Sequence, residues 1–223
     1  AFAQQLKQLA EWMSGHDLMD AAVQERLQRL ENQVRTDKVM VAFVAEFSRG
    51  KSELINSIFF ADYGRRIMPA SAGRTTMCPT ELGYDPAFAP SLRLLPIETR
   101  LQMQGLAEWR LKHDRWVEIP LDVNDADQIA KALEKVAEIR RVSLDNARAL
   151  GFWHDDLAEE NPVPDAEGMV EVPMWRHALI NIPHPLLKQG LVILDTPGLN
   201  AVGAEPELTV NLIPQAHAVV FIL

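Results

Sequence analysis

A short apolar run that leads straight into a Gly-Lys-Ser turn limits the fold of this chain more than any other feature. Residues 39–44 read VMVAFV, residues 45–52 read AEFSRGKS, and residues 53–58 read ELINSI. The first run is typical of a buried strand, and the last favours a helix. A strand, a turn with Gly-Lys-Ser and a helix form the setting that a phosphate-binding loop requires. The pattern predicts an α/β fold of P-loop type, with the loop at the carboxyl end of its strand.

Such a loop offers a polyphosphate curled backbone N–H donors, a helix N-terminus and a mobile cation. Lys51 would be the cation for the β- and γ-phosphates, and the Ser52 hydroxyl would ligate Mg²⁺. Ala45 stands where the pattern has its first glycine, and a position that needs a positive φ would be strained by alanine. The alternative is an ordinary turn with a surface lysine, which the flanking strand-like and helical stretches disfavour.

A second motif follows another apolar run, LVIL at residues 191–194, and reads DTPGLN at residues 195–200. In P-loop GTPases, an aspartate at this strand end holds a water of Mg²⁺, and the glycine N–H reports the γ-phosphate. Asp195 and Gly198 would take these roles here. The alternative is an ordinary Asp-Thr-Pro-Gly turn, which becomes the weaker interpretation because the motif ends a strand downstream of a phosphate-binding loop.

A polar loop rich in glycine and proline lies between the two motifs, with the sequence IMPASAGRTTMCPTEL at residues 67–82. It runs into a strand-like stretch at residues 80–84. In small GTPases a threonine in this place closes onto Mg²⁺ only while the γ-phosphate is present. Thr75 and Thr76 are the candidates, and the alternative is a flexible surface loop.

Together these motifs resemble the dynamin superfamily, in particular its bacterial dynamin-like and mitofusin-like branch. The resemblance rests on AEFSRGKSELINSIF, on Met-Pro followed by GRTTMCPTEL, on IPHPLLKQGLVILDTPGLN and on IPQAHAVVFIL. It covers residues 38–96 and 179–223. It implies a three-layer α/β sandwich of P-loop GTPase type with a mixed, mostly parallel sheet, preceded by N-terminal helices.

The resemblance also implies roles for individual residues. Lys51 would contact the phosphates, Ser48 would help to hold a monovalent cation, and the Thr76 carbonyl would position the attacking water. The catalytic residues implied in this way are Ser48, Lys51 and Thr76. The nucleotide-binding residues implied are Glu46, Phe47, Ser48, Arg49, Gly50, Lys51, Ser52, Glu53 and Gly198. The metal ligands implied are Ser52, Thr76 and Asp195.

The sequence departs from the family pattern in two respects. Arg49 occupies a position that usually holds a small residue, where it would either clash or add positive charge beside the phosphates. An Asn/Thr-Lys-x-Asp element, on which guanine selectivity rests, does not occur in the sequence. Because the last residues also read as a buried strand, we expect a GTPase domain that is truncated at its C-terminus.

The domain organisation follows from the apolar spacing. Residues 1–36 are predicted to be helical, with one apolar stripe from Phe2 to Met13 and a second from Val23 to Val34. The resemblance makes this segment part of a helical bundle. Residues 37–223 form the predicted GTPase domain, with an insertion at about 97–178.

Within the insertion, the sequence predicts a strand-like piece over residues 109–121 and a helix from Asp125 to about Leu150. An acidic stretch at residues 155–171 reads as a loop. Ile129, Leu133, Val136 and Ile139 lie at helical spacing and are expected in the core. The tryptophans of the insertion are expected to pack a satellite core.

Composition limits the partners. A net charge of −9 argues against nucleic acid as a partner and against a membrane-binding surface on this part of the protein. A single cysteine, Cys78, excludes an internal disulfide and fits a reducing cytosol, so we expect a cytoplasmic location, peripheral to a membrane at most.

The function that these inferences predict is hydrolysis of GTP to GDP with Mg²⁺, coupled to self-association through the GTPase face and to membrane remodelling. Membrane contact would use regions outside this chain. The alternatives are a nucleotide-gated scaffold with little or no hydrolysis, an ATP-using P-loop protein, and a structural domain with an empty site.

Overall fold

The computed structural model describes residues 2–16, 18–20, 23–24, 27, 38–45, 50–69, 78–156, 161–197 and 212–222. The chain divides into two compact units, Ala1–Val39 and Met40–Leu223. In the first unit, α1 spans Phe2–Ser14, so the helix predicted from the first apolar stripe is confirmed. The stretch from 28 to 37, where the second stripe ends, lies outside the described residues.

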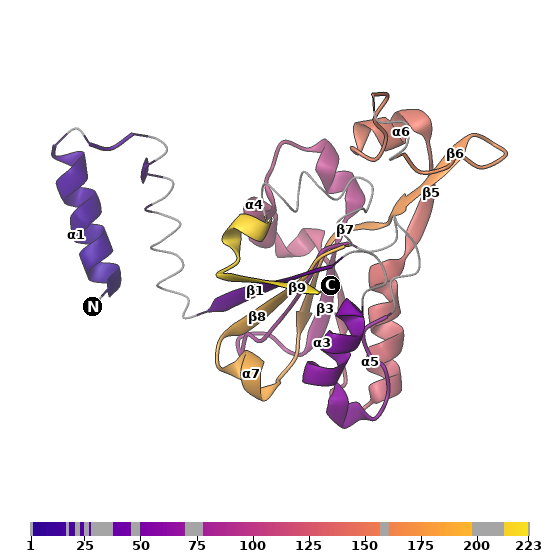
Figure 1. Cartoon of the computed structure of the whole chain (residues 1–223), viewed down its shortest axis with the longest axis horizontal. Coiled ribbons are helices and arrows are strands. Elements are labelled where there is room, and N and C mark those ends of the chain that lie inside the picture. Colours follow the sequence, from indigo (N-terminus) through magenta and orange to yellow (C-terminus); the bar gives the residue numbers. More distant parts are fainter. Residues whose placement is uncertain are drawn as a thin grey trace. The chain divides into compact units, whose positions relative to one another are not determined.

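A mixed sheet organises the second unit (Figure 1). In the described part of the chain it has seven strands, in the order β4 (Val117–Pro120), β3 (Ser91–Pro96), β7 (Trp175–Asn181), β2 (Thr80–Gly83), β8 (Leu191–Asp195), β1 (Val39–Ala45) and β9 (Ala218–Ile222). The pairs β1–β9 and β2–β7 are parallel. The pairs β2–β8, β3–β4 and β3–β7 are antiparallel. The predicted α/β fold is therefore confirmed.

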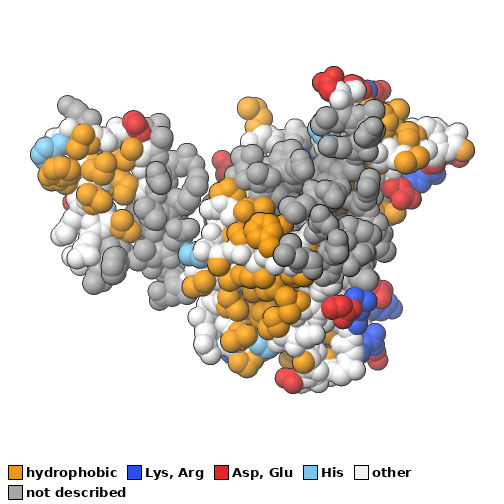
Figure 2. Space-filling view, in the orientation of Figure 1, with side chains coloured by type: hydrophobic (Ala, Val, Ile, Leu, Met, Phe, Trp, Pro, Cys, Tyr) orange, Lys and Arg blue, Asp and Glu red, His pale blue; other side chains and the backbone are white. Residues whose placement is uncertain are grey.

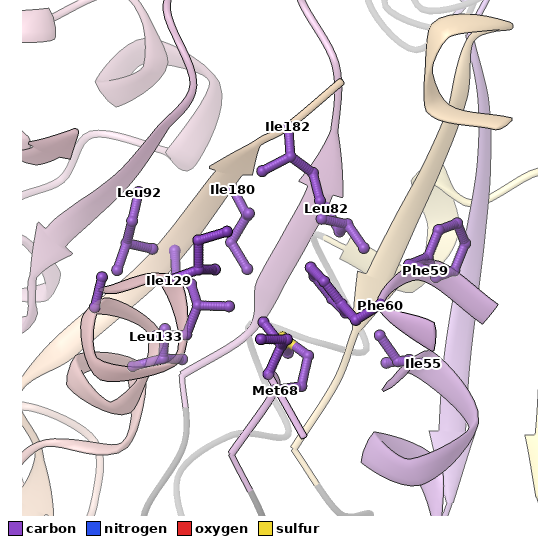
Figure 3. Close-up of a cluster of buried hydrophobic side chains, with 14 of the residues drawn as sticks. Ile55, Phe59, Phe60, Met68, Leu82, Leu92, Ile129, Leu133, Ile180 and Ile182 are labelled. Carbon is purple, nitrogen blue, oxygen red and sulfur yellow. The ribbon is translucent and has the colours of Figure 1, made fainter. Parts of the chain in front are cut away.

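Successive strand residues point to opposite sides of the sheet, and a hydrophobic cluster covers the central strands on each side. On one face, α3 (Lys51–Phe59) and α5 (Ala126–Leu133) pack against the strands. Figure 3 shows this main cluster, with Ile55 and Phe59 from α3 and Ile129 from α5 directed toward strand residues such as Leu82. The predicted core positions Ile129, Leu133 and Val136 belong to it.

The opposite face is covered by α4 (Leu106–Arg110), the 3₁₀ turn η3 (His113–Arg115) and the segment from Leu212. Leu106, Trp109 and Trp116 pack there against Val44 and Leu194. Helices, sheet and a second covering layer together give the predicted three-layer arrangement. The 3₁₀ turns η1 (Ala61–Tyr63) and η7 (Ile213–Gln215) and the short helix α7 (Pro185–Lys188) complete the connections around the sheet.

The inserted region contains more strand than the sequence predicted. After η2 (Ile97–Leu101), α4 and β4, helix α5 ends at Leu133 and continues only as the 3₁₀ turn η4 (Glu134–Ala137). Next come β5 (Ile139–Ser143), α6 (Leu144–Ala149) and β6 (Met169–Pro173). The predicted helix to about Leu150 is therefore too long, because β5 pairs with the distant β6 in a two-stranded antiparallel sheet. Ile139, which was expected in the core, is 39% exposed.

The other predictions for the insertion are also corrected in part. The piece predicted as strand over 109–121 holds the end of α4, a turn and only the short β4, and the end of the acidic stretch belongs to β6. A satellite cluster joins Ile97, Val142, Phe152, Val170 and Val172 with their neighbours. The tryptophans do pack cores, but they are divided among three clusters. Trp175 lies in the main cluster, Trp109 and Trp116 on the opposite face, and Trp153 beside the satellite cluster.

Strand β9 forms one edge of the sheet in the described part of the chain. Val219, Val220 and Phe221 on this strand are exposed apolar residues. Figure 2 shows hydrophobic side chains gathered over the region of β8 and β9. Among the helices that are described, none combines the length and the hydrophobicity needed to cross a bilayer.

Candidate nucleotide site

The turn between β1 and α3 depends on a glycine. Gly50 is the N-cap residue of α3 and has φ 83° and ψ 12°, a left-handed conformation that costs L-residues free energy and glycine little. An added Cβ at Gly50 would meet nothing within 4 Å, so the requirement comes from the backbone. Residues 46–49 lie outside the described residues. Gly-Lys-Ser thus places Lys51 and Ser52 in the first turn of the helix.

Ala45 is the last residue of β1 and pairs with Ile222 in the parallel ladder with β9. It therefore has the extended backbone of a strand, which alanine adopts without strain. The expected conflict between alanine and a positive φ does not arise at this position.

Lys51 and Asp195 meet at one end of the sheet, where β1 and β8 finish. The Lys51 ammonium donates to Asp195 Oδ1, and both side chains are buried, at 8% and 2% exposure. Lys51 comes from the first turn after β1, and Asp195 is the last residue of β8. The turns that follow these two neighbouring strands therefore lie at the same end of the sheet.

Two further contacts fix the end of β8. The Thr196 hydroxyl donates to the Phe43 carbonyl of β1 at 2.8 Å, and the Thr196 N–H donates to the same oxygen at 3.4 Å. On the other side, Asp195 is the cross-strand partner of Thr80 in β2. These contacts tie Asp195 to both neighbouring strands, and sequence reasoning had assigned no role to Thr80 or Thr196.

Asp195 is a buried carboxylate with Lys51 as its cationic partner. Burial raises the pKa of Asp195, and the ammonium of Lys51 opposes that effect only in part. Asp195 Oδ2 is buried and has no hydrogen-bond partner among the described residues. The carboxylate therefore has one oxygen paired with a cation and one oxygen still without a donor.

The donor set suits Mg²⁺. Carboxylate and hydroxyl oxygens are ligands that this ion prefers, and Asp195 Oδ2 and the buried Ser52 hydroxyl are both of this kind. Within the described ranges, no group of three or more His, Cys, Asp or Glu residues is arranged to hold a metal. Mg²⁺ is usually held by one or two protein oxygens together with substrate phosphates and water, so the residues present fit this ion.

Asn56 is a further polar residue of the site region that sequence reasoning missed. It is buried on α3 and hydrogen-bonds to Ser52, Ile67 and Met68. A polar residue between the buried Ile55 and Phe59 on an amphipathic helix was the available signal. Glu53, next to Ser52, is exposed and forms an ion pair with Arg66.

The structure describes only part of the predicted site. Of the residues assigned to it, Gly50, Lys51, Ser52, Glu53 and Asp195 are described. Those that lie outside the described residues are Glu46, Phe47, Ser48, Arg49, Thr76 and Gly198, together with the alternative threonine Thr75.

Cys78, which follows Thr75 and Thr76 in the sequence, is buried, and burial raises the pKa of its thiol to about 12. Its thiol is therefore protonated at neutral pH, as expected for an inert cysteine.

Comparison with known proteins places this chain in a family. The family model for the dynamin family matches residues 41–223. No curated protein matches the sequence. Among solved structures, the chain is similar to two that belong to an oligomerised bacterial dynamin pair, which is described as a mechanism for long-range sensing and tethering of membranes.

The first of these structures is 21% identical, with a TM-score of 0.44, over 90% of this chain and 23% of its own. The second is 15% identical, with a TM-score of 0.40, over 98% of this chain and 26% of its own. This chain thus spans only 23% and 26% of the length of the two structures. The family assignment rests on the match over residues 41–223, which include most of β1, the Gly-Lys-Ser turn and Asp195. The chain belongs to the dynamin family.

Proposed function

We propose that the full-length protein binds GTP and GDP with Mg²⁺ and hydrolyses GTP. The observation that carries this proposal is the contact between Lys51 and Asp195 at the end of the sheet. It brings a cation at a helix N-terminus and a buried carboxylate to one place, and the buried Ser52 follows Lys51 in the sequence. A triphosphate with its metal ion needs these three groups together.

In the proposed reaction, the residues of this chain act by position and charge. Lys51 binds the β- and γ-phosphates, and the N–H groups of the first turn of α3 point toward the same oxygens. Ser52 and Asp195 would hold Mg²⁺, and the ion would supply positive charge to neutralise the phosphates. The family resemblance adds Ser48 for a monovalent cation and Thr76 for the attacking water. Such a site stabilises a loose phosphoryl-transfer transition state mainly by electrostatics.

Single-turnover hydrolysis by the full-length protein tests the enzyme activity. Lys51→Ala removes the proposed phosphate-binding cation and should lower the rate by at least about 100-fold. Lys135→Ala is the matched control, because Lys135 is exposed and pairs only with Glu138 on the surface. Equal rates in wild type and Lys51→Ala would reject hydrolysis at this site and leave the nucleotide-gated scaffold or a structural domain with an empty site. Because Asp195 loses its cation in Lys51→Ala, thermal unfolding must first show that the variant is folded.

The choice of base needs a separate experiment. Displacement of a fluorescent guanine nucleotide from the full-length protein by GTP and by ATP measures it directly. We expect GTP to compete and ATP to fail at the same concentration. Equal competition by both would contradict GTP as the substrate and favour the ATP-using alternative.

We further propose self-association through the nucleotide-binding face, and contact with a membrane through parts of the protein outside this chain. These proposals rest on family membership, and the solved bacterial pair is described as oligomerised and membrane-tethering. Sedimentation of the full-length protein with a non-hydrolysable GTP analogue, with and without anionic lipid vesicles, tests both. A monomer that ignores nucleotide and vesicles would contradict them.

A further inference from the structure

Asn56 uses its whole side-chain amide on backbone atoms. Its Oδ1 accepts hydrogen bonds from the N–H groups of Ile67 and Met68, at 2.9 and 2.7 Å. Its Nδ2 donates to the carbonyl oxygens of Ser52 and Met68, at 2.9 and 3.1 Å. A carboxamide offers two acceptor sites and two N–H donors, so every group of this side chain is satisfied.

These bonds connect two parts of the chain that the proposed reaction needs close together. Ser52 lies in the first turn of α3 and is the proposed metal ligand. Ile67 and Met68 follow η1 and lead toward the stretch that holds Thr76. The ion pair between Glu53 and Arg66 joins the same two segments at the surface. Two connections thus join α3 to residues 66–68, the buried hydrogen bonds of Asn56 and the exposed ion pair of Glu53 with Arg66.

We propose that Asn56 is a positioning residue for GTP hydrolysis, which fixes the segment entering the switch stretch to the helix that carries Ser52. This inference rests on the proposed function. A displacement of about 1 Å in reacting groups can lower a rate on the order of 100-fold. Removing the four hydrogen bonds lets Ile67 and Met68 shift relative to Ser52, so hydrolysis slows even though Asn56 touches no phosphate.

A purely structural role for Asn56 makes a different prediction. Ile67 and Met68 also bury their side chains in the main cluster, at 2% and 1% exposure, so packing holds them as well. If Asn56 only stabilised the fold, its loss would weaken all nucleotide binding and stability together. If Asn56 positions the switch segment, its loss lowers kcat and leaves the affinity for GDP unchanged. The reason is that a switch threonine responds to the γ-phosphate, which GDP lacks.

The experiment compares Asn56→Ala, Asn56→Asp and the matched control Ser57→Ala in the full-length protein. Ser57 is exposed on the same helix and its hydroxyl donates only to the Glu53 carbonyl. We expect Asn56→Ala to lower kcat by about 10- to 100-fold and to keep the Kd for GDP within about threefold of wild type. Asn56→Asp keeps an acceptor for the Ile67 and Met68 N–H groups but sets a second acceptor oxygen against two carbonyl oxygens, so its kcat should fall at least as far as that of Asn56→Ala. Ser57→Ala should match wild type.

Hydrogen exchange of the Ile67 and Met68 amides gives a measurement that needs no nucleotide. Both amides should exchange at least about tenfold faster in Asn56→Ala than in wild type or Ser57→Ala. Unchanged kcat, equal losses of kcat and GDP affinity, or unchanged exchange would each overturn the inference. If Asn56→Ala does not fold, the same criteria apply to Asn56→Asp. A wild type that hydrolyses no GTP would overturn the proposed function, whereas a wild type matched in kcat by Asn56→Ala would overturn only the role of Asn56.

Discussion

Glu81 is a buried carboxylate whose charge is balanced inside the protein, on the opposite face of the sheet from Asp195. It accepts a hydrogen bond from Arg110, and the Nε2 atom of His177 lies 3.0 Å from the same oxygen. Burial raises the pKa of Glu81, but Arg110 and His177 outweigh that effect and bring the pKa to about 2. Glu81 is therefore ionised at neutral pH.

This low pKa makes Glu81 a source of acid sensitivity. Its ordinary pKa is 4.5 and its folded pKa is about 2, so the ionised form stabilises the fold above pH 4.5. That contribution is lost as the pH falls from 4.5 toward 2. Glu81→Gln should lower the free energy of unfolding at pH 7 by up to about 3 kcal/mol.

Urea unfolding across this pH range measures the effect. The difference in the free energy of unfolding between wild type and Glu81→Gln should narrow as the pH falls from 4.5 toward 2, because the carboxylate of the unfolded wild-type chain takes up a proton in this range and glutamine takes up none. Glu118→Gln, at an exposed residue of β4, is the control. Its free energy of unfolding should differ little from that of wild type at all pH values. If the difference in free energy of unfolding between wild type and Glu81→Gln stayed constant with pH, the low pKa of Glu81 would be contradicted.

At the scale of single residues, the sequence predicted what local motifs encode. Lys51 and Asp195 stand in recognisable patterns, and the structure brings them into contact. The roles of Thr196 and Glu81 were not predictable, because each depends on a backbone or charged partner from a distant part of the chain. A motif specifies its own turn, whereas these contacts exist only after the sheet has assembled.

At the scale of elements, two glycines begin helices in different backbone conformations. Gly50 caps α3 with φ 83°, and Gly105 caps α4 with φ −74°. An added Cβ would meet nothing within 4 Å at either position. The two glycines therefore differ in backbone strain and not in space.

Alanine at these two positions should separate strain from capping. Gly50→Ala should lower the free energy of unfolding by about 1–2 kcal/mol more than Gly105→Ala, because only Gly50 needs the left-handed region. The loss of a capping glycine is common to both variants and cancels in the comparison. Urea unfolding of both variants measures the difference, and equal effects would show that the φ of Gly50 is not fixed by the fold.

The limits of sequence reasoning about elements lie in the insertion. The apolar spacing of Ile129, Leu133 and Val136 correctly predicted a buried helical face. The same spacing extended to Ile139, yet that residue starts β5, whose partner strand begins only at Met169. Local periodicity does not report a pairing across such a separation, and tertiary context decided the outcome.

At the scale of the whole molecule, the second unit contains hydrophobic clusters that share no buried residues. The main cluster includes Phe59 of α3, and the satellite cluster includes Phe152. Phe152 is 2% exposed and lies under the guanidinium of Arg100, which is 4.6 Å from its ring centre. Mutations in clusters without shared partners usually have independent effects.

The satellite cluster can therefore be weakened without disturbing the nucleotide site. Phe152→Ala should lower the free energy of unfolding by about 3–5 kcal/mol and leave the Kd for GDP within about twofold. Phe59→Ala, at a residue that is 4% exposed, should cost a similar free energy and also weaken GDP binding, since α3 carries Lys51. Urea unfolding and GDP titration of both variants provide the comparison. Equal losses of GDP affinity would show that the clusters are coupled.

The contact between Lys51 and Asp195 has a consequence for the order of events under the proposed function. A phosphate that binds the Lys51 ammonium must displace it from the Asp195 carboxylate, which is buried and has no other ion-pair partner among the described residues. A hydrated divalent ion that binds together with the phosphates would restore a positive charge beside Asp195. Anion and metal would therefore enter as mutually reinforcing ligands, each raising the affinity for the other by the same factor, as thermodynamic reciprocity demands.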